Sequence, residues 1–335
     1  MVKILTYHEI DQQQWNELIQ SSPTATWFQT KEAYEFYASV GTELAPFALG
    51  IEEYGELKGV IVGYTTQEKN PIKQLITCRS IIIGGPLLDQ HISTDALSAL
   101  LLAVKQLTKG AIYVETRNFN DYSKWREIFE QCGFQYQPHL NFHVDTSSVE
   151  VVDKNLGKSR KRDIRTTIRD GVIPVYQPTL EQVRAYYDIL LDLYNSKVKT
   201  PLFCWEWFEQ LHKVKNARFI LTELKGKIVG GTVCVELPGR ALYEWFACGI
   251  DGVYPHIYPS TYATYLGIQY AAEHGCQIFD MMGAGKPDEA YGVRDFKAEF
   301  GGELVEHGRF LCVRKPLLYW IGKMGVKWLK RRINK

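Results

Sequence analysis

The chain resembles itself at a spacing of 168 residues, and this repeat constrains its fold more than any other feature. Arg126 and Gly133 in REIFEQCGFQYQPHLNF recur as Arg294 and Gly301 in RDFKAEFGGELVEHGRF. The order of expected elements repeats as well: two strands, a long strand, a glycine turn, a helix, a strand, a second helix and a closing strand pair. Mixed sheets flanked by helices around a central strand-turn-helix predict an α/β (α+β) acyltransferase-like lobe, present twice in tandem.

Residue patterns place the boundaries of these lobes. The first lobe is predicted to span 1–148 and the second 149–313, followed by a basic helix over 314–335. Apolar periodicity predicts helices over 94–107, 158–169, 180–194 and 205–214. Ser260 is the expected N-cap of a helix that ends near 274.

Composition predicts a cytoplasmic protein. The N-terminal residues lack the uninterrupted apolar run of a signal peptide, and no later run reaches the length of a membrane span. The seven cysteines are scattered without a CxxC pair, as expected for reduced core residues. No metal site and no resident cofactor are expected.

Positive charge is concentrated at the end of the chain. Residues 314–335 contain eight Lys or Arg and no Asp or Glu, although the whole chain has a formal charge of +1. Along a helix, Leu317, Ile321, Met324 and Trp328 share one side, whereas Lys323, Lys327, Lys330 and Arg331 lie mostly on the other. This pattern fits either a helix on an anionic membrane surface or a helix whose apolar side docks on the body of the protein.

Lys297 is the strongest catalytic candidate. Its counterpart in the first copy of the repeat is the apolar Phe129, so only the second lobe gains a cation there. An ammonium at this place would stabilise the oxyanion that forms when an amine attacks an ester or thioester carbonyl. The alternative is that Lys297 lies on the solvated face of a helix beside Glu299.

Two other features of the second lobe bear on chemistry. Asp280 ends a predicted strand and is either a general base or a residue that caps and orients the following turn. The segment GIDGVYPHIYPST, before the helix near 260, is where an acetyltransferase lobe would hold a pyrophosphate. It lacks the usual glycine-rich run, which argues against binding of acetyl-CoA.

The helix predicted over 158–169 has a basic face that includes Arg162, Arg165 and Arg169. These side chains would meet phosphates of a nucleic acid, a nucleotide or a phospholipid headgroup, or they would simply be solvated.

The segments YEWFACGID, YPSTYATY, FDMMGAGKP, YGVRDFK and FGGE resemble the FemABX peptidyltransferases, which build the interpeptide bridges of peptidoglycan. The segments IIIGGPL and YVETRN of the first lobe agree with this resemblance, which covers nearly the whole chain. It implies two tandem GNAT-like domains, a charged tRNA as donor and a muropeptide acceptor. Some members of the family carry a long helical hairpin within the second domain, and this sequence departs from them because it shows no such insertion.

The resemblance also implies roles for individual residues. The Lys that follows Phe in the family's motif assists transfer, and that role falls on Lys297. Asp280 is a second catalytic candidate because of its position at the end of the predicted strand, not because of the resemblance. Substrate-binding candidates are Phe296, Arg294, Tyr254, Tyr258, Lys197, Lys199, Arg162 and Arg165.

We therefore expect an aminoacyltransferase of peptidoglycan biosynthesis, acting in cell wall biogenesis and the maintenance of cell shape. The expected reaction moves an amino acid from aminoacyl-tRNA to an amine of lipid II or UDP-MurNAc-pentapeptide, with peripheral contact at the inner face of an anionic membrane. One alternative is an acyl-CoA-dependent N-acyltransferase that acts on a cell-wall or polysaccharide precursor. Another is a protein that binds the precursor at the membrane surface without catalysis.

Overall fold

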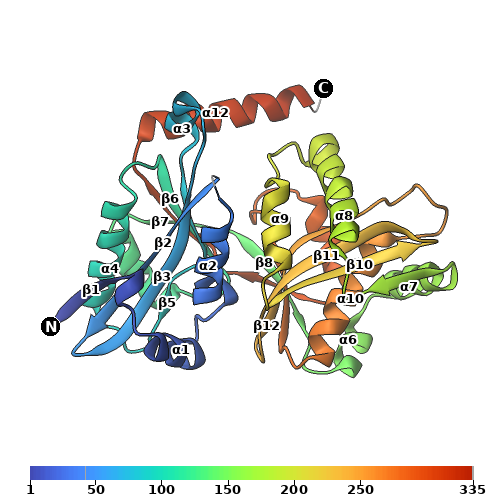
Figure 1. The fold of residues 1–335 in the computed structure, drawn as a ribbon, viewed down its shortest axis with the longest axis horizontal. Coiled ribbons are helices and arrows are strands. Elements are labelled where there is room, and N and C mark those ends of the chain that lie inside the picture. Colours follow the sequence, from blue (N-terminus) through green and yellow to red (C-terminus); the bar gives the residue numbers. More distant parts are fainter. Residues whose placement is uncertain (42, 334–335) are drawn as a thin grey trace. The chain divides into compact units, whose positions relative to one another are not determined.

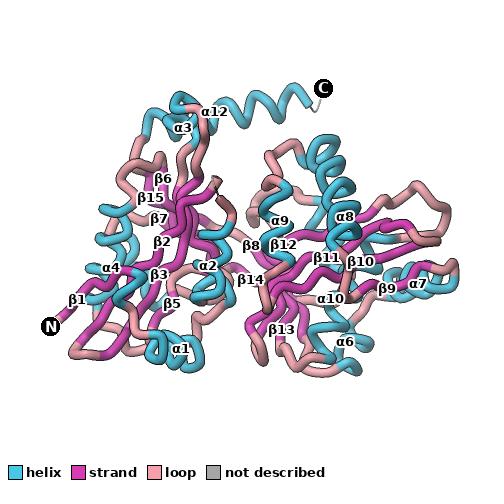
Figure 2. Tube along the Cα trace, in the orientation of Figure 1, coloured by secondary structure: helices cyan, strands magenta, loops and turns pink. Residues whose placement is uncertain are grey.

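Two compact units make up the protein (Figure 1). The computed structural model describes the backbone of residues 1–41 and 43–333 and the side chains of those residues up to 325. The first unit comprises Met1–Pro138 and His307–Lys335, and the second comprises His139–Glu306. Each unit is a mixed sheet with helices packed on it (Figure 2), so the predicted tandem α/β architecture is confirmed.

The sheet of the first unit runs in the order β1-β2-β3-β4-β6-β15-β7, with β5 paired to β3. Its strands are β1 (Val2–Thr6), β2 (Leu44–Glu53), β3 (Glu56–Thr66), β4 (Ser80–Gly84), β5 (Leu87–Leu88), β6 (Tyr113–Asn118), β7 (Gln135–Gln137) and β15 (Arg309–Val313). The helices of this unit are α1 (Gln12–Ser21), α2 (Lys31–Ser39), α3 (Pro71–Thr77), α4 (Thr94–Leu107), α5 (Arg126–Gln131) and α12 (Pro316–Ile333). Helix α4 has its predicted bounds because Ser93 caps its start and Leu97, Leu100 and Val104 form a buried stripe against the core.

The sheet of the second unit runs in the order β14-β8-β13-β12-β11-β10-β9. Its strands are β8 (Leu140–Asp145), β9 (Val172–Val175), β10 (Ala217–Leu224), β11 (Lys227–Leu237), β12 (Ala241–Gly249), β13 (Ile278–Gly283) and β14 (Glu303–Glu306). Its helices are α6 (Val149–Asn155), α7 (Lys158–Arg169), α8 (Leu180–Leu193), α9 (Trp205–His212), α10 (Pro259–Glu273) and α11 (Gly292–Ala298). Helix α7 matches its prediction, whereas α8 and α9 end one and two residues before the predicted 194 and 214.

The last strand of each repeat lies in the sheet of the other unit. Strand β8 closes the first repeat but pairs with β13 and β14, and β15 closes the second repeat but pairs with β6 and β7. The units therefore differ from the predicted 1–148, 149–313 and 314–335: residues 139–148 belong to the second unit, and residues from 307 onward belong to the first. The alternation of side chains along a strand does not specify which distant strand it pairs with, so the sequence pattern did not reveal this exchange.

The two copies of the repeat differ where Lys297 was predicted to act. In α5 of the first unit, Phe129 is fully buried and stacks on Phe310, with ring centroids 4.0 Å apart and planes 14° apart. The same position in α11 of the second unit carries Lys297. The first unit thus completes an aromatic core at this position, and the second unit places a cation there.

The glycine pair after α11 fits a backbone crossing that leaves no room for a side chain. Gly301 has φ +79°, and a Cβ at this residue would lie 2.2 Å from the Asn155 carbonyl oxygen at the end of α6. A Cβ at Gly302 would lie 2.8 Å from the His143 carbonyl oxygen. Both obstacles are backbone atoms, so this turn brings α11 against α6 and β8 only with glycine.

We expect Gly301→Ala to destabilise the protein by at least about 2 kcal/mol, because positive φ and a backbone clash add together. The matched control is Gly133→Ala at the equivalent position of the first repeat. Gly133 has φ +85°, but its Cβ would meet only the flexible Lys105 ammonium, at 3.1 Å. Urea unfolding measures both variants, and equal losses of stability would contradict the proposed clash.

Candidate active site

A pocket of about 470 Å³ opens in the second unit where two parallel strands separate. Strands β12 and β13 pair only from Ala241 with Ile278 to Tyr243 with Asp280. Beyond that point both strands line the pocket, together with the C-terminal end of α8 and the first turns of α10 and α11. A larger hollow of about 740 Å³ lies near the C-terminal ends of α9 and α10, but we place the site in the smaller pocket because it contains a buried ammonium and a buried carboxylate.

Lys297 is the buried ammonium. Lys297 belongs to α11 and is only 8% exposed. The alternative that it lies on the solvated face of a helix is therefore wrong. The ammonium donates hydrogen bonds to the carbonyl oxygens of Met281 and, at 2.8 Å, Gly283. Burial lowers the pKa of Lys297, and the charges of Glu244 and Asp280 oppose that shift.

The backbone of β13 explains why Lys297 finds partners there. The register of β13 against β8 shifts between Asp280 and Gly283, and Met282 has φ 57°. The carboxylate of Asp280 stabilises this irregular turn by accepting a hydrogen bond from the Met282 N–H at 2.6 Å. Because β13 has lost its pairing with β12 at this point, its carbonyls need other partners, and Lys297 supplies them.

Asp280 contacts the turn and β8. Its other carboxylate oxygen lies 3.3 Å from the His143 Nε2 atom, across the paired strands β13 and β8. Asp280 is almost fully buried and does not line the pocket. Of the two roles expected for Asp280, general base or residue that orients the turn, these contacts fit the second.

Glu244 is a candidate that the sequence analysis missed. It is a buried residue of β12 that lines the pocket, and its Oε1 atom accepts hydrogen bonds from the hydroxyls of Thr232 (3.1 Å) and Thr264 (2.9 Å). Burial raises the pKa of Glu244, although Lys297 and the two threonines oppose the shift. The sequence feature that could have identified Glu244 is an acidic residue inside an otherwise apolar strand.

A bulge in β12 brings Glu244 and its neighbours to the pocket. Val233 of β11 pairs with Phe246, and Cys234 pairs with Glu244, so Trp245 is an extra residue in β12. Such a bulge breaks the alternation of side chains between the two faces of a sheet. The bulge directly follows Glu244, and the residues from Glu244 to Gly249 all line the pocket.

Only two of the predicted substrate-binding residues line the same pocket as Lys297. Phe296 adjoins it in α11, and Lys197 lies on the π-helical turn Tyr194–Val198. The exposed Lys199 has φ 56°, and its ammonium donates to the Asn195 carbonyl of the same turn. Lys199 therefore caps a turn and does not line the pocket.

The other candidates in the second half of the chain support the surrounding backbone. Arg294 donates to the carbonyls of Ala284 (2.9 Å) and Lys286, and so holds the loop after β13. Tyr254 packs partly against the core, and the Tyr258 N–H donates to the Thr167 hydroxyl at 3.0 Å. None of these three residues lines the pocket.

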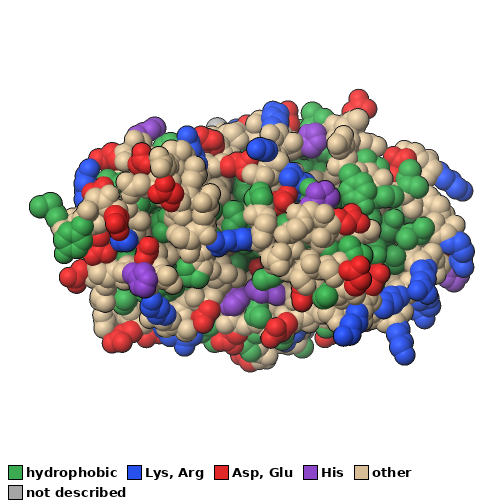
Figure 3. Space-filling model, turned by 90° about the horizontal axis from the view of Figure 1, so that it is seen from below, with side chains coloured by type: hydrophobic (Ala, Val, Ile, Leu, Met, Phe, Trp, Pro, Cys, Tyr) green, Lys and Arg blue, Asp and Glu red, His purple; other side chains and the backbone are tan. Residues whose placement is uncertain are grey.

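Helix α7 carries the predicted basic face. Lys and Arg side chains gather over the end of the second unit where α7 lies (Figure 3). A shallow hollow of about 280 Å³ on this helix is lined by Lys158, Lys161, Arg162, Arg165 and Thr166. Arg162 and Arg165 therefore lie together, but on α7 and not in the pocket of Lys297.

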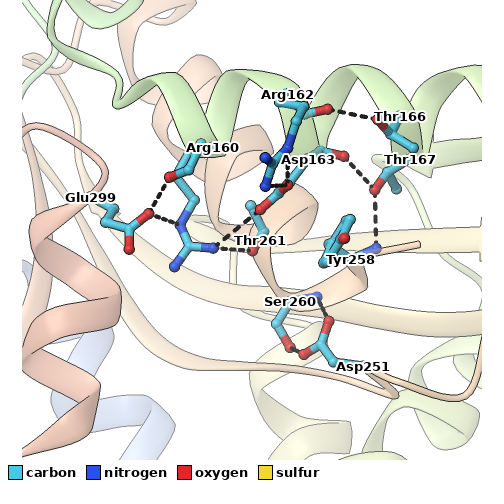
Figure 4. Close-up of polar contacts among 11 residues, drawn as sticks. Arg160, Arg162, Asp163, Thr166, Thr167, Asp251, Tyr258, Ser260, Thr261 and Glu299 are labelled. Atoms are coloured by element: carbon cyan, nitrogen blue, oxygen red, sulfur yellow. Dashed lines mark hydrogen bonds and ion pairs between the residues drawn. The ribbon is translucent and has the colours of Figure 1, made fainter. Parts of the chain in front are cut away.

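Arg160 joins α7 to the helix of Lys297 (Figure 4). Its guanidinium donates to the Thr261 hydroxyl at 3.2 Å and lies 3.5 Å from the Glu299 carboxylate. It also lies over the ring of Phe296, 4.7 Å from the centroid. Arg160 thus positions the residue that precedes Lys297.

The N-terminus of α10 is occupied by a carboxylate. Ser260 is not the N-cap as predicted: Tyr258 is, because Pro259 takes the first helical position, where its missing N–H costs nothing. The Asp251 carboxylate accepts hydrogen bonds from the Ser260 N–H, at 3.2 Å, and from the Ser260 hydroxyl (Figure 4). A negative charge therefore occupies the place where an acetyltransferase lobe would hold a pyrophosphate.

A metal ion needs ligating side chains in a particular arrangement. Among the side chains that the structure describes, up to residue 325, no group of three or more His, Cys, Asp or Glu is arranged to hold a metal ion.

Comparison with known proteins agrees with the predicted resemblance. Residues 209–325 match the FemAB family, a stretch that includes the pocket residues from Glu244 to Lys297. The sequence matches no curated protein significantly.

The fold is similar to that of several solved proteins over nearly the whole chain. FemX has a TM-score of 0.72 at 15% identity, covering 95% of this chain and 99% of its own. A tandem GNAT protein from the clavulanic acid biosynthesis pathway has a TM-score of 0.61 at 10% identity, covering 94% and 99%. The L-PGS of Bacillus licheniformis has a TM-score of 0.56 at 14% identity, covering 91% and 92%. The tandem GNAT-like fold and the FemABX resemblance are both confirmed.

The pair of His143 and Asp280 predicts a pH-dependent contribution to stability. Burial alone would lower the pKa of His143, but Asp280, through its charge and hydrogen bond, and Glu303 together raise it overall. A raised pKa means that the stabilisation is complete below the unfolded value of about 6.5 and is lost as pH rises through the folded value. The stability lost in His143→Gln should therefore be larger at pH 6 than at pH 9.

Urea unfolding across this pH range measures the effect, with the exposed His91→Gln as the control. A loss of stability in His143→Gln that does not change with pH would contradict the ion pair.

Proposed function

We propose that this tandem GNAT-like protein of the FemAB family transfers an amino acid from aminoacyl-tRNA to an amine of a peptidoglycan precursor, lipid-linked or UDP-linked. The observation that carries the proposal is the buried Lys297 ammonium in a pocket that also contains the Glu244 carboxylate. An ammonium has three N–H donors, and two of them bond to the carbonyls of Met281 and Gly283. The third is available to a carbonyl oxygen that becomes charged during transfer.

The reaction begins with the acceptor amine. The amine enters in its neutral form, and Glu244 takes a proton from its nitrogen as the C–N bond forms, because the raised pKa of the Glu244 carboxyl group makes it a stronger base than an exposed carboxylate. The nitrogen lone pair attacks the ester carbonyl carbon, a C–N bond forms, and the carbonyl electrons move to the oxygen. Lys297 donates a hydrogen bond to that oxyanion from its buried position.

Collapse of the tetrahedral intermediate completes the transfer. The C–O bond to the ribose of the tRNA breaks, and the proton held by Glu244 passes to the leaving ribose oxygen. The products are an amide on the acceptor and an uncharged tRNA, and Glu244 returns to its ionised form. Phe296 lines the same pocket as Lys297 and Glu244.

Two features favour an aminoacyl-tRNA over acyl-CoA as the donor. The Asp251 carboxylate, from the loop before α10, accepts a hydrogen bond from the Ser260 N–H of the first turn, so it would repel a pyrophosphate and already occupies an amide that would bind one. The basic hollow on α7 offers Lys158, Lys161, Arg162 and Arg165 to the phosphates of a polynucleotide. Arg160 links that helix to Phe296, so the donor would be bound next to the transfer site.

Lys297→Gln should reduce kcat by about 10²- to 10³-fold, because it removes the charge that stabilises the oxyanion while keeping N–H donors for the two strand carbonyls. Transfer from aminoacyl-tRNA to a muropeptide precursor is the assay, and thermal unfolding verifies the fold. Lys286→Gln is the matched control, since its exposed ammonium pairs with Glu289 on the loop after β13. Near-normal turnover by a folded Lys297→Gln variant would contradict the mechanism.

The donor is tested by binding titrations with acetyl-CoA and with aminoacyl-tRNA. We expect the wild-type protein to bind the charged tRNA and to bind acetyl-CoA no tighter than the millimolar range. Asp251→Ala should bind acetyl-CoA about fivefold more tightly, because the Ser260 N–H becomes free and a negative charge is removed. Micromolar binding of acetyl-CoA by the wild type, with transfer of its acetyl group, would replace this proposal with the acyl-CoA reaction.

A further inference from the structure

Helix α3 of the first unit exposes an apolar stripe. Ile72, Leu75 and Ile76 follow helical spacing and are between 52% and 73% exposed, and no residue of α3 is buried. A helix of seven residues is marginally stable in water when nothing covers its apolar side. A partner that covers the stripe would therefore stabilise α3.

Helix α12 continues this stripe. It contacts α3, and the two helices lie side by side (Figure 1). Leu317, Trp320, Ile321 and Met324 occur at the spacing of one helix face and are between 50% and 70% exposed. We call these four residues, with the three of α3, the two-helix surface.

The opposite side of α12 is the one attached to the body of its unit. The ring of Tyr319 packs edge-on against Tyr113 of β6, with centroids 5.5 Å apart. The Lys315 ammonium donates to the Gly110 carbonyl at 2.6 Å. The alternative in which the apolar side docks on the body is therefore wrong for the side chains that the structure describes, whereas Trp328, Lys327, Lys330 and Arg331 lie outside them.

Charge identifies the kind of surface that would cover these residues. The chain from 314 to its last residue has eight Lys or Arg and no Asp or Glu. Lys69 and Lys73 flank the stripe of α3, with Glu68 as the adjoining acidic residue. An apolar stripe bordered by cations matches the boundary of an anionic bilayer, where phosphates lie above acyl chains. None of the helices in the described residues is long and apolar enough to cross a bilayer, so the contact would be peripheral.

We propose that the two-helix surface rests on anionic phospholipid, with its apolar side chains inserted below the headgroups and its lysines among the phosphates. Trp320 suits this position because an indole has an apolar body and one polar N–H, and tryptophan is enriched at membrane interfaces. The proposal does not depend on the transfer reaction, because the surface lies in the first unit and lipid binding needs no turnover.

The test is flotation of the full chain with vesicles of phosphatidylglycerol and phosphatidylcholine, and with vesicles of phosphatidylcholine alone. We expect binding to the anionic vesicles, weakening as salt is raised, and little binding to the neutral ones. The double variants Leu75→Glu/Ile76→Glu and Trp320→Glu/Ile321→Glu should each bind at least about tenfold more weakly. The matched control is Leu102→Glu/Leu107→Glu, which changes two equally exposed leucines of α4 in the same unit and should bind as the wild type does.

Three results would overturn the proposal. One is binding by both double variants equal to that of the wild type. Another is equal binding to neutral and anionic vesicles. The third is a concentration-dependent dimer, seen by sedimentation and lost in the double variants, with no vesicle binding, because the two-helix surface would then be covered by a second copy of the chain. A folded variant that loses vesicle binding but keeps transfer to a soluble acceptor separates this result from any failure of the proposed reaction.

Discussion

A buried ammonium is stable only where the protein supplies acceptors for its protons, and the second unit supplies them where β12 and β13 stop pairing. The carbonyls of Met281 and Gly283 accept hydrogen bonds from the Lys297 ammonium instead of from the N–H groups of a neighbouring strand. Strand separation thus provides both the acceptors for the cation and the space of the pocket beside it. The opposite strand, β12, has a bulge at Trp245 and carries the Glu244 carboxylate, so one diverging strand supplies the proposed base and the other holds the ammonium of Lys297 from α11.

Local patterns were enough to predict much of this organisation. Ser93 and an apolar stripe specify α4, and the periodicity of 158–169 specifies α7. Lys297 was found because the repeat provides an internal comparison, in which a cation replaces the buried aromatic Phe129. A difference between two copies of one scaffold points to function more directly than the residue type alone.

Other features depend on contacts that no local pattern contains. Glu244 reaches the pocket through a bulge, which requires one more residue in β12 than in the strand that it pairs with. Ser260 was predicted as a cap because its residue type is favoured there, but Pro259 takes the first helical position and Asp251 supplies the carboxylate from an earlier loop. Of the predicted binding residues, Arg294 and Lys199 donate hydrogen bonds to backbone carbonyls. A long basic side chain can donate to the carbonyls of a turn as readily as to a ligand, so residue type alone did not distinguish the two roles.

The exchange of final strands has a consequence for how the chain is made. A ribosome synthesises β15 only after the entire second unit, yet β15 lies between β6 and β7 in the sheet of the first. Until residue 313 has left the exit tunnel, β6 and β7 of the nascent protein lack the strand that joins them. The unit that is translated first is therefore completed last. While the second unit is being translated, the unpaired edges of β6 and β7 need to be shielded from pairing with other chains.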